Sequence, residues 1–233
     1  GSVMGGKAQS AYLMKWNRYY NARALYKILD AGVLPRLTTE PFSANVNGKK
    51  MSFDRGTIVI PVSQRDANST LTEDDIHNLM NDIAVENHVN IYATNSASTP
   101  TGPDLGGAFQ GLLKKPKVAI LSGRGTSSYG VGEVWHLLNH RMHIPASLVD
   151  ANNLSQRKLS HYNTLILADG NYTMLDSTDI QSIKDWNKEG GTLITTGSAS
   201  RWAVNKKITT EKIKKNKQIN LDIAYSRVRN TTG

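Results

Sequence analysis

A serine and an aspartate, each directly after an apolar run, are the residues best placed to do chemistry. Ser198 follows the run 193–195, and Asp169 follows the run 164–167. The carboxyl ends of parallel strands meet at one edge of a sheet, where open α/β sheets bind ligands, so we expect the two side chains close together. A serine hydroxyl attacks a substrate only after a base has taken its proton. Because no histidine lies downstream of this serine, a hydrolase would need Asp169 or Glu133 to assist it.

A second candidate is a glycine-rich turn at residues 123–128, between an apolar run and a predicted helix. Backbone N–H groups at such a turn can hold an anion, and Arg124 would be its charged partner. A dinucleotide-binding turn would carry a third glycine where this chain has Ser128. Short turns between a strand and a helix also need glycines for purely structural reasons. We expect an anionic group or a peptide carboxylate here in preference to a dinucleotide. The predicted ligand contacts are Gly123, Arg124, Gly125, Ser127, Asp169 and Gly170.

Glu133, His136 and His140 are spaced i, i+3 and i+7, so they share one face of a predicted helix. A carboxylate and two imidazoles could together bind a metal ion. A solvent-exposed polar face opposite an apolar face produces the same spacing, however, and that interpretation requires no ligand. We expect no metal and no cofactor in this chain. These three residues are the best candidates for metal ligands that the sequence offers.

The elements that would position these residues occur twice, and equivalent strands begin at Ala11 and Val118. Each copy shows short apolar runs and two helical patterns, in the order β-α-β-β-α-β. Apolar runs with little alternation are typical of strands that are covered on both faces. The sequence therefore predicts the α/β class, with two repeated flavodoxin-like halves, mainly parallel strands and helices on both faces of each sheet.

Breaker residues and charge divide the chain into segments. Asn47-Gly48 predicts the turn of a β-hairpin inserted near 44–53 in the first unit. Glycines and prolines after that unit predict a linker without regular structure. Beyond the second unit the alternation of strand and helix patterns weakens, although residues 221–228 predict a strand. We expect the chain to be truncated there. The predicted segments are a first α/β unit at 7–98, a linker at 99–116, a second α/β unit at 117–204 and a basic C-terminal segment at 205–233.

The totals exclude several classes of protein. The chain has 233 residues, 39% hydrophobic side chains and no cysteine, which is ordinary for a globular protein and excludes disulfides and thiolate sites. No apolar run approaches the roughly 20 residues that span a bilayer, so no membrane span is expected. The net charge of +9 comes mainly from the last 33 residues, which carry nine basic and two acidic side chains. Because no aromatic side chains interleave the lysines there, we expect no nucleic-acid partner.

Three stretches carry a resemblance to a known family: WNRYYNARALY at 16–26, FDRGTIVIPV at 53–62 and GRGTSSYGVGEVWHLL at 123–138. Together they resemble the C-terminal region of large bacterial zinc carboxypeptidases of the carboxypeptidase A-like class, a region described as class I glutamine amidotransferase-like. The likeness covers most of residues 11–204, and it makes the second unit the amidotransferase-like one. It implies a periplasmic or secreted parent protein with a catalytic zinc domain upstream. That peptidase domain is the implied partner, and zinc is implied as a cofactor of the parent only.

Neither activity that the resemblance implies has a complete set of residues in this chain. A zinc peptidase site needs His-x-x-Glu and a later histidine, and none of the six histidines has a glutamate three residues later. In the amidotransferase-like pattern Gly-x-Cys-x-Gly, Ser198 occupies the cysteine position, and the family's downstream histidine base is missing. The resemblance therefore implies a non-catalytic accessory domain for substrate or interdomain binding. The alternatives are a Ser198-dependent hydrolase and a module that binds an anionic small molecule at 123–128.

Overall fold

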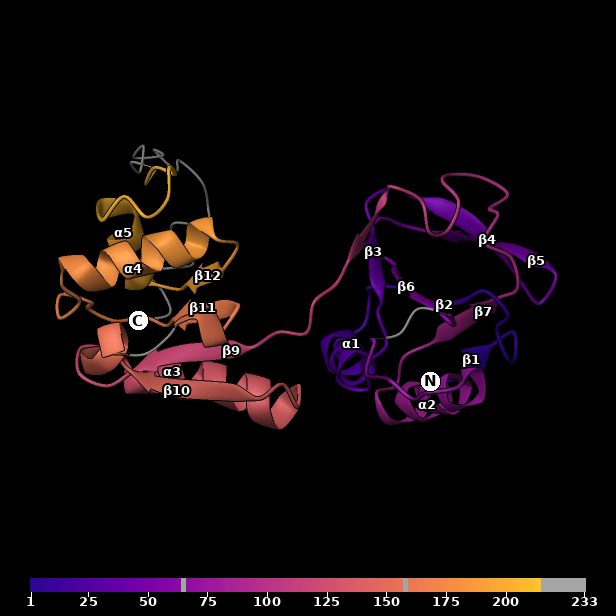
Figure 1. Ribbon diagram of the computed structural model, residues 1–233, viewed down its shortest axis with the longest axis horizontal. Coiled ribbons are helices and arrows are strands. Elements are labelled where there is room, and N and C mark those ends of the chain that lie inside the picture. The colour runs from indigo at the N-terminus through magenta and orange to yellow at the C-terminus, as the bar shows by residue number, and fades with distance from the viewer. Residues whose placement is uncertain (64–65, 157–158, 215–233) are drawn as a thin grey trace, which may run out of the picture.

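The computed structural model describes residues 1–63, 66–156 and 159–214, which form two α/β units joined by an extended stretch at 113–117 (Figure 1). Each unit has its own sheet and its own buried apolar clusters. The first unit carries α1 (Asn21–Asp30) and α2 (Glu73–Glu86), and the second carries the remaining helices.

The sheet of the first unit is mostly antiparallel. Its strands lie in the order β1-β7-β2-β6-β3-β8, and of these neighbours only β1 and β7 run parallel. The prediction of mainly parallel strands is therefore wrong for this unit. The strands are β1 (Val3–Met4), β2 (Ala11–Met14), β3 (Arg36–Thr38), β6 (Ile58–Pro61), β7 (Ile91–Thr94) and β8 (Gln110–Leu112).

Helices cover one face of this sheet, and a β-hairpin covers the other. Tyr12 and Ile58 face the cluster formed with α1 and α2, whereas Leu13 and Val59 face the hairpin of β4 (Phe42–Val46) and β5 (Lys49–Phe53). Strands that are covered on both faces read as continuous apolar runs, whatever covers them. The prediction of helices on both faces is therefore wrong for this sheet. The hairpin covers one face, and it buries the strands as a helix would.

The predicted hairpin is confirmed, and the predicted linker is mostly wrong. Asn47 and Gly48 have φ values of 51° and 71°, the left-handed backbone that a two-residue hairpin turn requires. Within the supposed linker, β8 pairs with β3, and Thr101 forms a bridge with Ser43 of the hairpin. Most of 99–116 therefore belongs to the first unit. Strand β8 has three residues, too few for an apolar pattern to reveal it.

The second unit has the parallel sheet that its apolar runs predict. The strand order is β10-β9-β11-β12, and all neighbouring strands run parallel. The α/β class is thus confirmed, with a parallel sheet in this unit. The predicted repeat of two like halves is not confirmed, because the two sheets differ in strand direction. The strands are β9 (Val118–Ser122), β10 (Ala146–Asp150), β11 (Thr164–Leu167) and β12 (Thr192–Thr195).

Helices cover both faces of this second sheet, as predicted. Ile120 and Ile166 point to the face with α3 (Ser128–His136) and the π-helical turn η1 (Leu137–Arg141). Leu121 and Leu165 point to the opposite face, where α4 and α5 pack. The elements on that opposite face are η2 (Ala151–Gln156), η3 (Leu159–His161), α4 (Ser177–Lys188) and α5 (Ser198–Asn205). The strand predicted at 221–228 lies outside the described residues.

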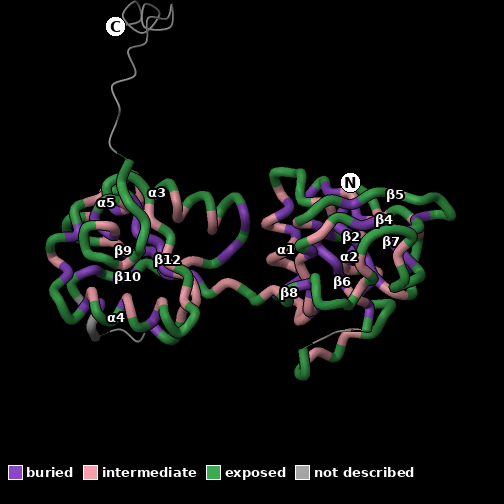
Figure 2. The backbone as a smooth tube through the Cα atoms, turned by 90° about the horizontal axis from the view of Figure 1, so that it is seen from above, coloured by how far each residue is buried: buried purple, intermediate pink, exposed green. Residues whose placement is uncertain are grey.

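Helix α1 of the first unit also packs against the second unit. Tyr20, Ala22 and Tyr26 pack against the apolar cluster on the α3 face of the second unit. Lys115, in the connecting stretch, forms an ion pair with Asp30 at the end of α1. Figure 2 shows α1 on the side of the first unit that faces the second. Tyr20, directly before α1, and Tyr26, within it, therefore form part of an interface between the units.

Candidate functional site

Three loops meet at the carboxyl edge of the second sheet, after β9, β11 and β12. The Ser127 N–H donates to the carbonyl oxygen of Asp169 at 2.8 Å, and the Asn171 N–H donates to the carbonyl oxygen of Gly125 at 2.6 Å. These bonds join the glycine-rich turn to the loop after β11. The predicted site residues from two separate strand ends therefore lie side by side, at the end of the sheet where parallel α/β proteins bind ligands.

Ser198 and Asp169 are in direct contact at this edge. The Ser198 hydroxyl lies 2.5 Å from Oδ1 of Asp169 and 2.7 Å from the carbonyl oxygen of Gly170, and its oxygen accepts from the Gly170 N–H at 3.1 Å. The Ser198 N–H donates to the same Oδ1 at 2.8 Å. Within the described part of the chain, the side chain of this serine bonds only to Asp169 and Gly170, and neither Glu133 nor a histidine reaches it.

Hydrogen bonds to its charged form set the protonation state of Asp169. The hydroxyl and the backbone N–H of Ser198 both donate to the carboxylate, and they hold the pKa of Asp169 below its ordinary value of 3.8. The carboxylate is therefore ionised near neutral pH. An effective general base has a pKa close to the working pH, so this carboxylate is a weak base. The contact holds the serine in place and is poorly suited to removing its proton.

The sharp turn between β12 and α5 is made by Gly197, and Ser198 is the first residue of the helix. Gly197 has φ 56° and ψ −131°, a backbone conformation that side chains rarely tolerate. A Cβ at this position would lie 2.6 Å from Oδ1 of Asp169. Folds that use a nucleophile after a strand place it on the strained turn itself. Here Gly197, which has no side chain, lies on that turn, whereas the sequence predicted the nucleophile position one residue later, at Ser198. Asp169 fills the space beside Gly197.

The glycine-rich turn has few free donors for an anion. The Thr126 N–H donates to the carbonyl oxygen of Gly123, and the Gly130 N–H donates to the side chain of Ser127, which caps α3. The Ser127 N–H is used as well, in its bond to the loop after β11. Asp150 also lies close, because a Cβ on Gly123 would be 2.8 Å from its Oδ1. Arg124, which is exposed, is then the main cationic group that this turn offers.

Two open hollows flank the loop after β11 and share Asn171. One, of about 480 Å³, lies beside Arg124, and the other, of about 400 Å³, lies between Ser198 and Arg201. Neither arginine forms an ion pair with another described residue. Asn171 belongs to the loop that starts at Asp169, after a strand end, whereas Arg201 was not predicted from the sequence. The signal for Arg201 was its position, three residues after Ser198 on the same helix.

The three residues considered for a metal do not form a metal site. Glu133 and His136 lie on α3 and His140 lies on η1, where the two imidazole rings stack with centroids 5.2 Å apart. Over the described ranges, no group of three or more histidine, aspartate or glutamate side chains could hold a metal ion. The zinc that the resemblance implies for a parent protein has no fitting site among these residues.

Asp169→Asn is expected to weaken the second unit at pH 7 and to have a smaller effect at about pH 3. The stabilisation from a carboxylate with a depressed pKa is complete above its unfolded-state pKa and is lost as the pH falls through the lower folded-state pKa. The pH range over which this stabilisation finally disappears therefore lies below 3.8, the ordinary pKa of an aspartate. Urea unfolding of both proteins at the two pH values measures the difference. Asp82→Asn, at an exposed position on α2, is the control, and an equal difference at both pH values would contradict this account.

None of the helices in the described residues is both long enough and apolar enough to cross a membrane. No protein-family model, no curated protein and no solved structure matches this chain.

Proposed function

We propose that this chain is a non-catalytic accessory module that binds a substrate or another domain at the carboxyl edge of its second sheet. The observation that carries the proposal is the contact of Ser198 with Asp169. The Ser198 hydroxyl, which the sequence predicts at the position of a nucleophile, faces a carboxylate and a carbonyl oxygen, and no imidazole reaches it within the described residues.

The energetics of proton transfer favour this proposal over a Ser198-dependent hydrolase. A base loses about 1.4 kcal/mol of driving force for each pH unit by which its pKa falls. The pKa of Asp169 lies below 3.8, several units from neutrality, whereas a hydrolytic triad uses an imidazole that titrates near pH 7. Glu133 makes no hydrogen bond to Ser198, so it offers no substitute.

The binding part of the proposal is supported by the groups at the sheet edge. Arg124 and Arg201 lie beside the two hollows and form no ion pair with the described residues. Guanidinium groups recognise carboxylates and phosphates through paired N–H donors. An anionic small molecule or a peptide carboxylate is therefore the ligand class that we propose for this edge, although Asp150 and Asp169 restrict where its charge can lie.

The wider context is also a proposal. The strand order β10-β9-β11-β12 is what a flavodoxin-like or amidotransferase-like unit would have in its first four strands, which agrees with the resemblance. On that basis we propose a parent related to periplasmic or secreted zinc carboxypeptidases, in which proteolysis takes place in a separate upstream domain. This chain would contact that domain and help to present its substrate.

The chain is expected to hydrolyse glutamine, ester and amide substrates no faster than a sample without protein. Ser198→Ala is expected to leave that trace rate unchanged, because the serine has no base to activate it. Steady-state assays of the two proteins at pH 7 measure this. Turnover above background that Ser198→Ala abolishes would establish the hydrolase and refute the proposal.

The same two samples also test the proposed binding role. Citrate or inorganic phosphate is expected to raise the melting temperature of the wild type and of Ser198→Ala, through binding to the folded state. Arg124→Gln and Arg201→Gln are expected to lose the shift, whereas Arg18→Gln, at an exposed position of the first unit, is expected to keep it. The absence of a shift in the wild type would count against an anionic ligand at this edge.

A further inference from the structure

One buried hydrogen-bond donor on α5 has no partner. The indole nitrogen of Trp202 is shielded from solvent, the whole side chain is 9% exposed, and within the described residues no acceptor reaches that nitrogen. Trp186, the other buried tryptophan of this unit, donates to the carbonyl oxygen of Tyr162 at 3.1 Å. A buried N–H without an acceptor has lost its bond to water with no replacement, which is costly. The Trp202 N–H is therefore a donor that a bound molecule could satisfy.

Trp202 lies beside the hollow of about 400 Å³ that Ser198 and Arg201 also line. These side chains share one face of α5, because residues three and four apart on a helix are neighbours. The loop after β11 forms the facing wall, where the ring of Tyr172 meets the ring of Trp202 with centroids 5.5 Å apart. The hydroxyl of Tyr172 is engaged, since it donates to the carbonyl oxygen of Ala168 at 2.7 Å. The unpaired donor of this aromatic pair is therefore the indole N–H.

The charge of this hollow is positive. Arg201 is the only charged side chain among the described residues that line it, and it forms no ion pair with another of them. Asn171 accepts from the Thr173 N–H at 3.1 Å through its side-chain oxygen, which leaves the side-chain amino group to face other partners. Arg124 adds positive charge in the neighbouring hollow, which shares Asn171. The wall therefore combines a guanidinium with neutral N–H donors.

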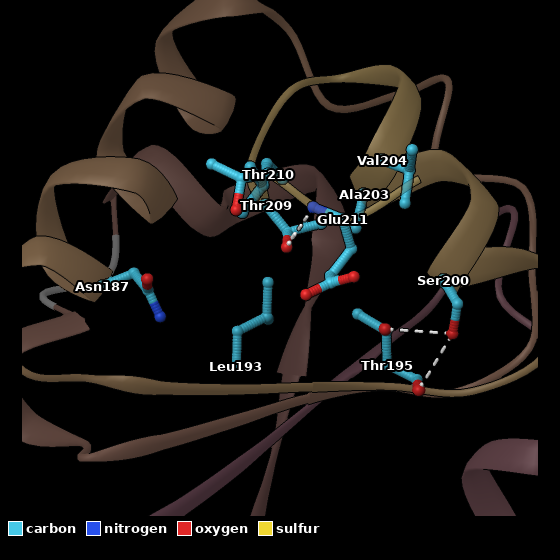
Figure 3. A pocket seen from close by; sticks show the side chains of 10 residues that line it. Asn187, Leu193, Thr195, Ser200, Ala203, Val204, Thr209, Thr210 and Glu211 are labelled. Carbon is cyan, nitrogen blue, oxygen red and sulfur yellow. Dashed lines mark hydrogen bonds between the residues drawn. The ribbon is translucent and has the colours of Figure 1, made fainter. Parts of the chain in front are cut away.

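The larger hollow against the opposite face of α5 has the opposite charge. Its volume is about 580 Å³, and Ser200 and Val204 of α5 line it. Figure 3 shows the carboxylate of Glu211 inside this hollow, near the hydroxyls of Thr195 and Ser200, which bond to each other at 3.0 Å. Glu211 would repel an anion placed there. Of the two hollows against α5, only the smaller one suits an anion.

The donors around the smaller hollow indicate the kind of anion. A guanidinium engages two oxygens of an oxyanion through its paired N–H groups. The indole N–H of Trp202 then needs a third oxygen, and a phosphate group has one to offer, whereas a carboxylate has two oxygens in all. We propose that this hollow binds a phosphate group, free or as a monoester, with Arg201 and the Trp202 N–H as its donors. This inference rests on the proposed function, and it selects phosphate among the anions considered there.

The indole N–H signals of the full chain, made with isotope-labelled tryptophan, test the proposal. Inorganic phosphate at constant ionic strength is expected to shift the Trp202 signal downfield in a saturable way. The N–H gains an acceptor, and the shielded ring has to turn toward the hollow to reach it. Trp186 is expected to keep its signal, because its N–H is already bonded. Acetate is expected to move neither signal. Tighter binding of phenyl phosphate or of inorganic phosphate distinguishes a monoester site from a free-ion site.

Two tryptophan variants with matched losses separate ligand contact from folding. Trp202→Phe and Trp186→Phe each remove one indole from the same buried cluster. Trp202→Phe and Arg201→Gln are each expected to weaken phosphate binding roughly 10-fold or more, as the loss of a hydrogen bond to a charged group does. Trp186→Phe is expected to keep the affinity. Isothermal titration calorimetry measures all four proteins.

Two results would overturn this inference and leave the proposed function intact. One is a Trp202 signal that stays in place while phosphate raises the melting temperature. The other is an equal loss of affinity in Trp186→Phe and Trp202→Phe, which would assign the effect to the buried cluster. If neither phosphate nor citrate binds the wild type, the proposed function fails and this inference fails with it. Should Trp202→Phe not fold, the wild-type spectra decide, with the Trp202 signal assigned by elimination from variants of the other three tryptophans.

Discussion

Gly197→Ala is expected to destabilise the second unit by about 2 to 4 kcal/mol. The backbone at this turn lies in a region that residues with a Cβ rarely adopt, with φ 56° and ψ −131°. A Cβ would also lie 2.6 Å from Oδ1 of Asp169, so the carboxylate would move and release its two bonds to Ser198. Urea unfolding followed by tryptophan fluorescence measures the effect, because three of the four tryptophans lie in the second unit.

The matched control is Gly132→Ala. Gly132 lies within α3, and a Cβ added there would meet no atom within 4 Å. Alanine has the higher helix propensity, so this variant is expected to be as stable as the wild type or more stable by up to about 1 kcal/mol. If Gly197→Ala cost less than about 0.5 kcal/mol in the same experiment, the turn would tolerate a side chain and the crowding argument would be refuted.

The crowding at Gly197 also bears on catalysis. In folds that place a nucleophile on a strained turn, the side chain projects from the turn itself. At this turn Asp169 occupies the adjacent space and bonds to both the N–H and the hydroxyl of the next residue. A cysteine introduced at position 197 would have to displace that carboxylate first. The proposal of a non-catalytic module therefore has a second support besides the lack of a histidine base.

Strand runs and turns could be predicted from the sequence, but what covers each strand could not. The run Ala11–Met14 is buried along its whole length, and the sequence correctly indicated a strand covered on both faces. A hairpin and a helix bury an apolar side chain equally well, so the pattern did not distinguish them. The direction of pairing in the first sheet depends on that tertiary choice. In the second unit, helical patterns between strands left parallel pairing as the natural arrangement, and the structure has it.

For the candidate site, the sequence indicated which residues follow the strands, but it did not indicate the backbone conformation of the turns. Ser198 and Asp169 lie together because both follow parallel strands of one sheet, which the apolar runs indicated. The turn at Gly197 and the hydrogen bonds that occupy the amides of 123–128 depend on dihedral angles that no local pattern specified. Side-chain spacing did place His140 beside His136, because the two imidazole rings stack, although a π-helical turn replaces the expected α-helix there.

Phe53→Ala is expected to destabilise the first unit by about 3 to 5 kcal/mol, the range for removing a fully buried aromatic side chain. Phe53 is 1% exposed, and its ring stacks on Phe42 with centroids 5.3 Å apart. The ring of Tyr92 meets it edge-on at 5.6 Å, and Nζ of Lys15 lies 5.1 Å from its centroid. Phe53 therefore joins the hairpin to the sheet, and its loss leaves a cavity between them. Urea unfolding followed by far-UV circular dichroism measures the cost.

Ser52→Ala on the same strand is the control, because the Ser52 side chain is exposed and its loss is expected to change the stability by less than about 0.5 kcal/mol. A cost below about 1 kcal/mol for Phe53→Ala would contradict the placement of the hairpin on the sheet. Leu13 and Val59 would then need a different cover, since both are buried and face the hairpin. Hydrogen exchange locates the effect, because the amides that pair β4 with β5 lose protection before those of the sheet if the hairpin is held mainly through Phe53.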